Sequence, residues 1–207
     1  MNFPRIIGVL VFPLFCILAS LFGLLADPYF TSALLHSVGK ETSVQPTNQL
    51  FLSFAGLSEI PGLFNVQEKS HMDDVTQLIR AGFLIFLGIA ALFFFCVRKS
   101  PEFINCGFYL LCILFVIIAI IPFENLFTAF HLLFFPQGNW MFDANSVIIQ
   151  TYPFNFFLNY AFSIAAYALF LGVILFIQST RKCRKLQWKT QVINIICCVF
   201  SNTWEIH

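Results

Sequence analysis

The sequence predicts an all-α membrane protein with four transmembrane helices and with both ends of the chain in the cytoplasm. Three observations predict this fold class: the composition, four long apolar runs, and the placement of Lys and Arg. Apolar residues make up 59% of the 207 residues, and charged residues make up only 10%. A soluble domain of this length carries more charge, so lipid is the expected solvent. We expect residues 1–207 to form one membrane domain, because no internal repeat or linker divides them.

Residues 6–25 form the first apolar run, which matches the roughly 20 helical residues that cross a hydrocarbon core. A cleaved signal peptide is the alternative for such a beginning. Its apolar region usually takes only about 7–15 residues, and Leu-Leu-Ala-Asp at residues 24–27 is a poor cleavage site. A lipobox is excluded because Phe15 precedes Cys16, where a small residue is required. We therefore predict a retained signal anchor.

Three further runs, residues 81–97, 104–121 and 154–177, predict the remaining spans. Ser70 and Asp73 fit the [ST]-x-x-[DE] pattern that begins a helix, just ahead of the second span. A helix over residues 71–97 would be about 40 Å long at 1.5 Å per residue, which exceeds the roughly 30 Å hydrocarbon core. Its first two turns are therefore expected to project above the membrane.

The two loops that these spans leave, residues 27–79 and 122–153, are expected to hold interfacial helical segments. Residues 49–55 and 60–66 are partly apolar and are predicted to lie among the lipid headgroups. Pro122 can kink the third span, after which residues 123–135 favour a continuing or interfacial helix. Gly138-Asn139 then predicts a turn.

Basic residues give the orientation, because they are enriched in cytoplasmic loops. Loop 122–153 has no Lys or Arg, and loop 27–79 carries only Lys40 and Lys69. Most of the other basic residues flank the opposite ends of the spans: Arg5, Arg98, Lys99, Arg181, Lys182, Arg184, Lys185 and Lys189. Both loops are therefore predicted to lie outside, and the tail over residues 181–207 is predicted to be cytoplasmic.

The composition also excludes several classes of partner and site. A net charge of +1 argues against nucleic acid as a partner. The outer loops contain no Cys, so no disulfide framework forms there, and the tail Cys residues lack CxxC spacing. Neither outer loop has a cluster of metal ligands, so we expect no metal and no other cofactor. The 29 Phe residues suit lipid-facing surfaces and helix packing without small-residue motifs.

Two histidines, His71 and His131, are the main candidates for chemistry, since both are predicted at the outer face at one membrane depth. A neutral imidazole can act as a base near pH 7. Interfacial histidines that only bridge water and lipid are the structural alternative, and paired ligation of a haem is a third reading. Motifs such as HExxH and GxSxG are absent from the sequence. His36 is expected to be a solvated loop residue.

Two polar stripes run along the predicted helices. Glu124, Thr128 and His131 recur at i, i+4 and i+7. The stripe on the fourth span comprises Asn155, Asn159, Ser163 and Tyr167. Such residues either hydrogen-bond neighbouring helices or line a groove that leads to a site, and the sequence leaves both readings open.

Four short motifs occur in order around the two histidines. They are Glu68-x-x-His71-x-x-Asp74-Val75, Phe130-His131-x-x-Phe134-Phe135, Asn139-Trp140-x-Phe142-Asp143 and Tyr152-Pro153-x-x-Phe156-Phe157. In these motifs the sequence resembles the lipoprotein intramolecular transacylase family of bacterial membrane proteins, and the resemblance covers about residues 50–178. Phe154 departs from the acidic residue expected after Pro153, and residues 186–207 have no counterpart that the resemblance explains.

The resemblance implies an acyltransferase of the bacterial cytoplasmic membrane whose active site lies on the outer face. The implied reaction moves the sn-2 acyl chain of an S-diacylglyceryl N-terminal cysteine to its own α-amino group, giving a lyso-form lipoprotein. The implied partners are a diacylated lipoprotein and membrane lipids; the sequence leaves the oligomeric state open. A non-enzymatic scaffold, or a subunit that binds lipid or protein, is the alternative function.

The motifs also imply roles for individual residues. His71 and His131 are the catalytic candidates, one as base and the other as acid, and Asp74 is expected to fix the tautomer of His71. Asn139 and Trp140 are candidate oxyanion donors by position. The remaining supporting residues of the motifs are Glu68, Asp143 and Tyr152. If the chain is an enzyme, the two imidazoles should converge within about 5–8 Å, because an acid and a base must reach one ester.

Overall fold

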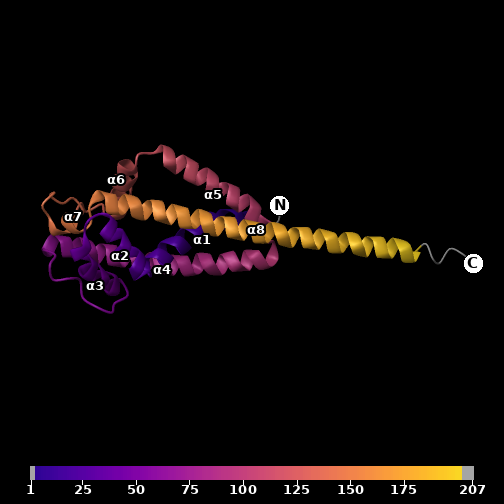
Figure 1. Cartoon of the computed structure of the whole chain (residues 1–207), viewed down its shortest axis with the longest axis horizontal. Helices are drawn as coiled ribbons and strands as arrows, with labels where there is room; N and C mark the ends of the chain where they lie inside the picture. The colour runs from indigo at the N-terminus through magenta and orange to yellow at the C-terminus, as the bar shows by residue number, and fades with distance from the viewer. Residues whose placement is uncertain (1–2, 202–207) are drawn as a thin grey trace, which may run out of the picture.

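The computed structural model describes residues 3–201, with side chains described as far as Arg181. Over residues 3–201 the chain forms eight α-helices and one 3₁₀-helix and contains no strand, which confirms the all-α prediction (Figure 1). Four of these helices are long and apolar enough to cross a membrane, as predicted: α1 (Phe3–Leu25), α4 (Val66–Lys99), α5 (Phe103–Ile120) and the Phe154–Arg181 part of α8 (Phe154–Ser201). The side chains of the tail beyond residue 181, and His207, lie outside the described residues.

Helix α1 is the helix around which the bundle packs, since it contacts α4, α5 and α8. Its buried residues Phe12 and Cys16 belong to a core that also contains Phe93 of α4, Phe103 of α5 and Ala168 of α8. The segment that the sequence predicts as a signal anchor therefore supplies the centre of the folded bundle.

Glycine and phenylalanine interlock reciprocally between α1 and α5. A Cβ atom on Gly8 would lie 2.5 Å from the ring of Phe103, and a Cβ on Gly107 would lie 2.6 Å from Cβ of Phe12. Both Phe rings are fully buried. The expectation of packing without small-residue motifs was wrong, because each large ring needs a glycine opposite it where the backbones approach closely.

A second layer of short helices covers the end of the bundle that carries the two long loops. It comprises α2 (Pro28–Ser37), η1 (Glu41–Ser43), α3 (Val44–Phe54), α6 (Phe123–Phe134) and α7 (Val147–Thr151). Leu35 of α2, Leu50 of α3 and Ile148 of α7 form a separate core with Met72 of α4, together with Tyr152 and with Phe156 of α8. Both loops therefore contain helices, as expected, although residues 60–65 are not helical.

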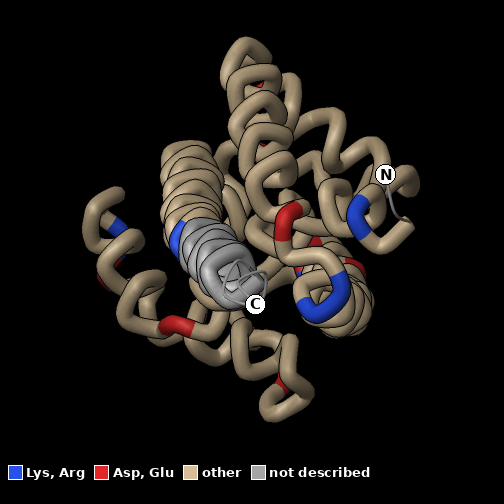
Figure 2. The backbone as a smooth tube through the Cα atoms, turned by 90° about the vertical axis from the view of Figure 1, so that its right-hand side faces the viewer, with Lys and Arg blue, Asp and Glu red and all other residues tan. Residues whose placement is uncertain are grey.

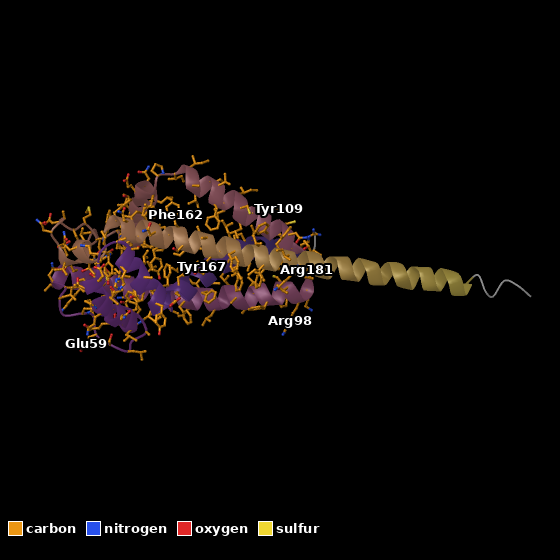
Figure 3. All side chains as sticks on the ribbon, in the orientation of Figure 1. Glu59, Arg98, Tyr109, Phe162, Tyr167 and Arg181 are labelled. Atoms are coloured by element: carbon orange, nitrogen blue, oxygen red, sulfur yellow. The ribbon has the colours of Figure 1, made fainter. Side chains whose placement is uncertain are left out.

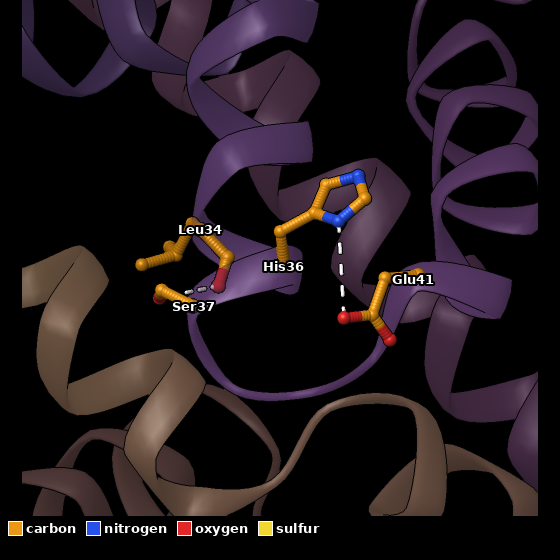
Figure 4. Close-up of polar contacts among 4 residues, drawn as sticks. All are labelled: Leu34, His36, Ser37 and Glu41. Carbon is orange, nitrogen blue, oxygen red and sulfur yellow. Dashed lines mark hydrogen bonds and ion pairs between the residues drawn. The ribbon is translucent and has the colours of Figure 1, made fainter.

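Helix α2 was not predicted, and it corrects the expectation that His36 is a loop residue. Asp27 caps the helix, because its Oδ1 accepts hydrogen bonds from the N–H groups of Tyr29 and Phe30. Figure 4 shows the exposed His36 ring near the end of α2, where Nδ1 lies 3.9 Å from Oε1 of Glu41. An exposed pair of this kind contributes little to stability.

Helix α4 begins five residues before the expected position. Asn65 is its N-cap: Oδ1 of Asn65 accepts from the N–H of Glu68, and Oε2 of Glu68 accepts from the N–H of Asn65. This capping box begins the helix, so the prediction that the Ser70–Asp73 pattern begins it was wrong. Ser70 and Asp73 lie inside the helix.

Helix α5 ends at Ile120, and α6 is a separate helix rather than a continuation. Ile121 has extended backbone dihedral angles, and Pro122 is the N-cap of α6. From there α6 turns toward α8 (Figure 1), where Phe123 and Phe127 contact Phe154 and Phe157. These aromatic contacts join the first half of α6 to the beginning of α8.

Basic residues gather at the end of the bundle opposite the short helices. Figure 2 shows Lys and Arg beside the N-terminus and at the connection between α4 and α5. Figure 3 shows Arg98 and Arg181 at this end and Glu59 at the other. Three basic residues lie instead near the short helices: Lys40 at the N-cap of η1, Lys69 in the first turn of α4, and Arg80. The guanidinium of Arg80 donates to the carbonyl oxygens of Phe54 and Ser53 at the end of α3.

Replacing Gly8 by Ala should destabilise the bundle, because the added methyl group overlaps the Phe103 ring. Overpacking of this kind typically costs about 1–3 kcal/mol. Gly23→Ala is the matched control on the same helix, since a Cβ there meets nothing within 4 Å. Thermal unfolding in detergent micelles should show a lower Tm for Gly8→Ala only, and the double variant Gly8→Ala/Phe103→Leu should recover part of the loss. Equal Tm values for the two single variants would contradict the interlocking.

Candidate active site

The structure brings His71 and His131 together from positions 60 residues apart in the chain. His71 lies in the second turn of α4, and His131 lies in the last turn of α6. Their ring centroids are 6.0 Å apart and the ring planes differ by 29°. This separation falls within the 5–8 Å expected for two groups that serve one ester.

His71 is buried in an aromatic environment, with only 5% of its surface exposed. The rings of Phe135 and Phe142 meet it edge-on, with centroid distances of 4.8 and 5.6 Å. Its Nδ1 atom is buried and has no hydrogen-bond partner among the described residues. Since the backbone of α4 and the two Phe rings restrict its movement, the orientation of this imidazole is set by packing.

His131 is partly exposed and has a defined tautomer. Its Nδ1 lies 2.7 Å from the carbonyl oxygen of Phe127, and a carbonyl only accepts, so Nδ1 carries the hydrogen. In the neutral ring the lone pair is therefore on Nε2. Burial lowers the pKa of His131, and the hydrogen bond to Phe127 opposes part of that shift. The ring is thus neutral and able to accept a proton at pH 7.

Aromatic rings flank His131 as well. The Phe127 ring lies at a centroid distance of 4.1 Å, and the Trp140 indole lies at 4.8 Å. Phe135 contacts both imidazoles, at 4.8 Å from His71 and 5.6 Å from His131. The two histidines therefore share one aromatic wall.

Glu68 is fully buried, yet its carboxylate accepts only backbone hydrogen bonds within the described chain. Besides the capping bond from Asn65, its Oε1 accepts from the N–H of Ile148 at 3.0 Å, in the first turn of α7. One side chain thus joins the beginning of α4 to the segment that follows the Trp140 loop. Glu68 supports the position of His71, one turn along the same helix, and its oxygens are occupied by this support.

Asp74 binds the loop that follows α6. Its Oδ2 accepts from Nε2 of Gln137 at 2.8 Å and from Nδ2 of Asn139 at 2.6 Å. Its hydrogen bonds in the described chain therefore go to this loop, whereas a direct bond to His71 was expected. Gly138, between the two donors, has φ +78°, which confirms the predicted turn and favours glycine at that position.

Asp143 and Tyr152 lie apart from the histidine pair. Asp143 is exposed, and its carbonyl oxygen accepts from the N–H of Ser146. The Tyr152 hydroxyl lies 3.0 Å from Oγ1 of Thr47; because Thr47 donates to the carbonyl of Ser43, Tyr152 is the donor. Burial raises the pKa of Tyr152 to about 12, and the bond to Thr47 acts in the opposite direction. Tyr152 therefore links α3 to the beginning of α8 as a neutral phenol.

Three groups of the site were not singled out from the sequence: Phe127, Gln137 and the N–H of Ile148. Phe127 lies at i−4 from His131, so helical spacing alone could have identified its carbonyl as a partner. Phe135 and Phe142 stand in the motifs that carry the resemblance, but the sequence did not predict that both rings contact His71. Gln137 is beside a predicted turn, and no pattern there indicates a bond to a residue 63 positions away.

Two members of the polar stripe on α8 make no hydrogen bond with the histidines in the described chain. Ser163 donates to the carbonyl oxygen of Asn159 within its own helix, and Tyr167, which Figure 3 labels midway along the span, is exposed. Over the part of the chain that is described, no three His, Cys, Asp or Glu side chains come together as metal ligands.

Comparison with known proteins identifies relatives with this arrangement of helices. Residues 6–157 match the model of the family described as lipoprotein intramolecular transacylase Lit. The match begins earlier than the resemblance noted in the sequence and includes the first span. No curated protein sequence gives a significant match to the chain.

Solved structures of a membrane-integral lipoprotein intramolecular transacylase from Bacillus cereus have the same fold. One has a TM-score of 0.76 at 15% identity, covering 89% of this chain and 96% of the other. Variants of that protein in which a histidine is replaced by alanine or by arginine give TM-scores of 0.72 and 0.67, at 17% and 20% identity. Each of these covers 89% of this chain and 94% of the other.

Glu68→Gln should destabilise the fold, because an amide offers one acceptor oxygen where two backbone N–H groups require two. Leaving one buried N–H unpaired costs about 1–3 kcal/mol. Glu59→Gln is the control, since Glu59 is exposed and loses the same charge. Thermal unfolding in micelles should lower the Tm of Glu68→Gln alone. If both variants have the same Tm as the wild type, the carboxylate does not join α4 to α7.

Proposed function

Because this chain belongs to the lipoprotein intramolecular transacylase family, we propose that it moves the sn-2 acyl chain of a diacylated lipoprotein to the α-amino group of the same N-terminal cysteine. The chain is an acyltransferase, and its reaction is intramolecular acyl transfer in lipoproteins. The observation that carries the detailed proposal is the 6.0 Å separation of the His71 and His131 rings. A non-enzymatic scaffold does not require two imidazoles to converge.

The proposed reaction needs one proton acceptor and one proton donor. The amine nitrogen attacks the ester carbonyl carbon, and Nε2 of one histidine takes the proton that the nitrogen loses. The tetrahedral intermediate collapses with cleavage of the bond to the glyceryl oxygen, which receives a proton from the imidazolium that the first step formed. The products are an N-acyl amide and a free glyceryl hydroxyl, so atoms and charge balance without a cofactor.

His131 is the stronger candidate for the base because its Nδ1–H is held by the Phe127 carbonyl, which leaves Nε2 free. General acid–base help of this kind contributes about 10²–10⁴-fold to a rate. Holding amine and ester in one molecule contributes more, since well-oriented intramolecular reactions gain roughly 7–11 kcal/mol. The protein therefore has mainly to orient a substrate that already carries both reacting groups.

The proposed location is a bacterial cytoplasmic membrane, crossed four times by one domain over residues 1–207, with the histidines on the outer face. Arg5, Arg98, Lys99 and Arg181 flank the opposite ends of the spans, which supports cytoplasmic termini under the positive-inside rule. The last turn of α6 has exposed apolar residues beside His131, including Leu132 and Leu133. Acyl chains in the outer leaflet could lie against them while the ester stays at the interface.

His71→Ala and His131→Ala should each abolish transfer while the protein still inserts into the membrane. The assay is mass spectrometry of the N-terminal lipopeptide from a diacylated reporter lipoprotein, produced with and without the chain. The wild type should give an N-acylated lyso form of unchanged total mass. His36→Ala is the matched control, because His36 is exposed on α2 and faces Glu41. Wild-type-like conversion by both catalytic-site variants would remove the histidines from the mechanism.

The rate should depend on pH in a way that separates the amine from His131. An α-amino group has a pKa of about 7.7–8.0, so below that pH the rate falls about tenfold per unit as the amine protonates. Because burial lowers the pKa of His131 from 6.5, its protonation should steepen this fall only below pH 6.5. Initial rates in micelles over pH 5–8 test this. If the rate already falls about a hundredfold per pH unit above pH 6.5, the result would contradict a neutral, buried base.

A further inference from the structure

Two buried polar atoms of the site, one on His71 and one on Asn139, lack hydrogen-bond partners among the described residues. Nδ1 of His71 and Oδ1 of Asn139 each have no hydrogen bond at standard geometry within the described residues. Buried polar atoms are nearly always paired, so each such atom requires an explanation. Asn139 is bonded to Asp74, which lies one helical turn from His71, so the Asn139 amide lies beside the part of α4 that carries the imidazole.

The orientation of the Asn139 amide is fixed by Asp74. An ionised carboxylate only accepts, so the group that lies 2.6 Å from Oδ2 of Asp74 must be the amide nitrogen. The amide oxygen is therefore on the other side of the group and cannot be exchanged with the nitrogen by a flip. Gln137, the second donor to the same carboxylate oxygen, helps to hold Asp74 in place.

We propose that Asn139 is a positioning residue that connects Asp74 to His71. In this arrangement the Asn139 nitrogen donates to Asp74, and the Asn139 oxygen accepts from Nδ1–H of His71. Because an amide oxygen only accepts, it selects the tautomer with hydrogen on Nδ1 and leaves the lone pair on Nε2. Catalytic hydrogen bonds are often long in unliganded enzymes and tighten with substrate, which accounts for the two unpaired atoms.

This arrangement gives both imidazoles the same tautomer, since the Phe127 carbonyl holds Nδ1–H of His131 in the same way. Each ring then presents Nε2 as its proton acceptor. A proton on Nε2 of His71 would also be stabilised by the negative charge of Asp74, transmitted through the amide dipole. The inference replaces the expected role of Asn139 as an oxyanion donor, and its effect on rate rests on the proposed function.

The test uses the full chain in detergent micelles with ¹⁵N-labelled histidine. NMR distinguishes protonated from unprotonated ring nitrogens, and His71→Gln and His131→Gln assign the two signals. We expect wild-type His71 to carry hydrogen on Nδ1. Asn139→Leu, which keeps the side-chain size, should convert His71 wholly or partly to the Nε2–H tautomer. The His131 signal should stay unchanged and so reports that the site remains folded.

Gln137→Leu is the matched control, because it removes the other donor to Asp74 Oδ2 and leaves Asn139 in place. It should keep the wild-type tautomer of His71 and change the rate by less than about fivefold, the effect of one exposed hydrogen bond. Asp74→Asn retains an acceptor oxygen and should also keep the tautomer. If Asn139→Leu does not fold, Asp74→Leu removes the anchor of the amide and should release the tautomer in the same way.

Wild-type His71 with hydrogen on Nε2, or an unchanged tautomer in folded Asn139→Leu, overturns the inference. The turnover assay separates this from the proposed function. A wild-type chain that transfers no acyl group contradicts the proposed function whatever the tautomer. If the wild type is active, Asn139→Leu should lose about 10²-fold in rate through the misplaced proton. Full activity with a changed tautomer would show that the connection does not position a catalytic group.

Discussion

The carboxylate of Glu68 is the interaction on which the arrangement of the site depends. A buried carboxylate is costly unless hydrogen bonds replace its hydration. Here they come from the N–H groups of Asn65 and Ile148, each of which would otherwise be unpaired at a helix beginning. The bonds fix where α4 begins and where the chain returns after the Trp140 loop. His71 is one turn beyond Glu68, so the same side chain sets the depth of the imidazole relative to the loop that covers it.

The sequence predicts the spans and a common depth for the two histidines for a physical reason. Spans depend on hydropathy averaged over some twenty residues, and a few polar positions do not change that average. His71 and His131 could be placed at one depth because each lies at the same distance in chain length from a span whose direction is known. The depth of a residue along the membrane normal can be predicted from a sequence in this way. Contact between two helices at the same depth cannot.

What the sequence could not supply is set by contacts between distant residues. The predicted helix beginning was Ser70, whereas Asn65 caps the helix, and its capping partner Glu68 also binds Ile148, 80 residues later. The bond between Asp74 and Asn139 spans 65 residues. The sequence therefore suggested His71, the neighbour of Asp74 on the helix, as its partner. The glycines of α1 and α5 were overlooked because Gly8 and Gly107 have meaning only when the opposing Phe rings are known.

An aromatic wall and an intramolecular substrate together explain how so small a polar site can suffice. The Phe and Trp rings around the imidazoles exclude water, which favours neutral rings that can accept a proton. An intramolecular reaction needs no second substrate site, and exchange of an ester for an amide requires no energy source. The chain can therefore devote its few polar groups to orientation: Glu68 holds the backbone, the Phe127 carbonyl holds His131, and Asp74 holds the loop beside His71. In the proposed reaction, the two Nε2 atoms are then left to accept and donate protons.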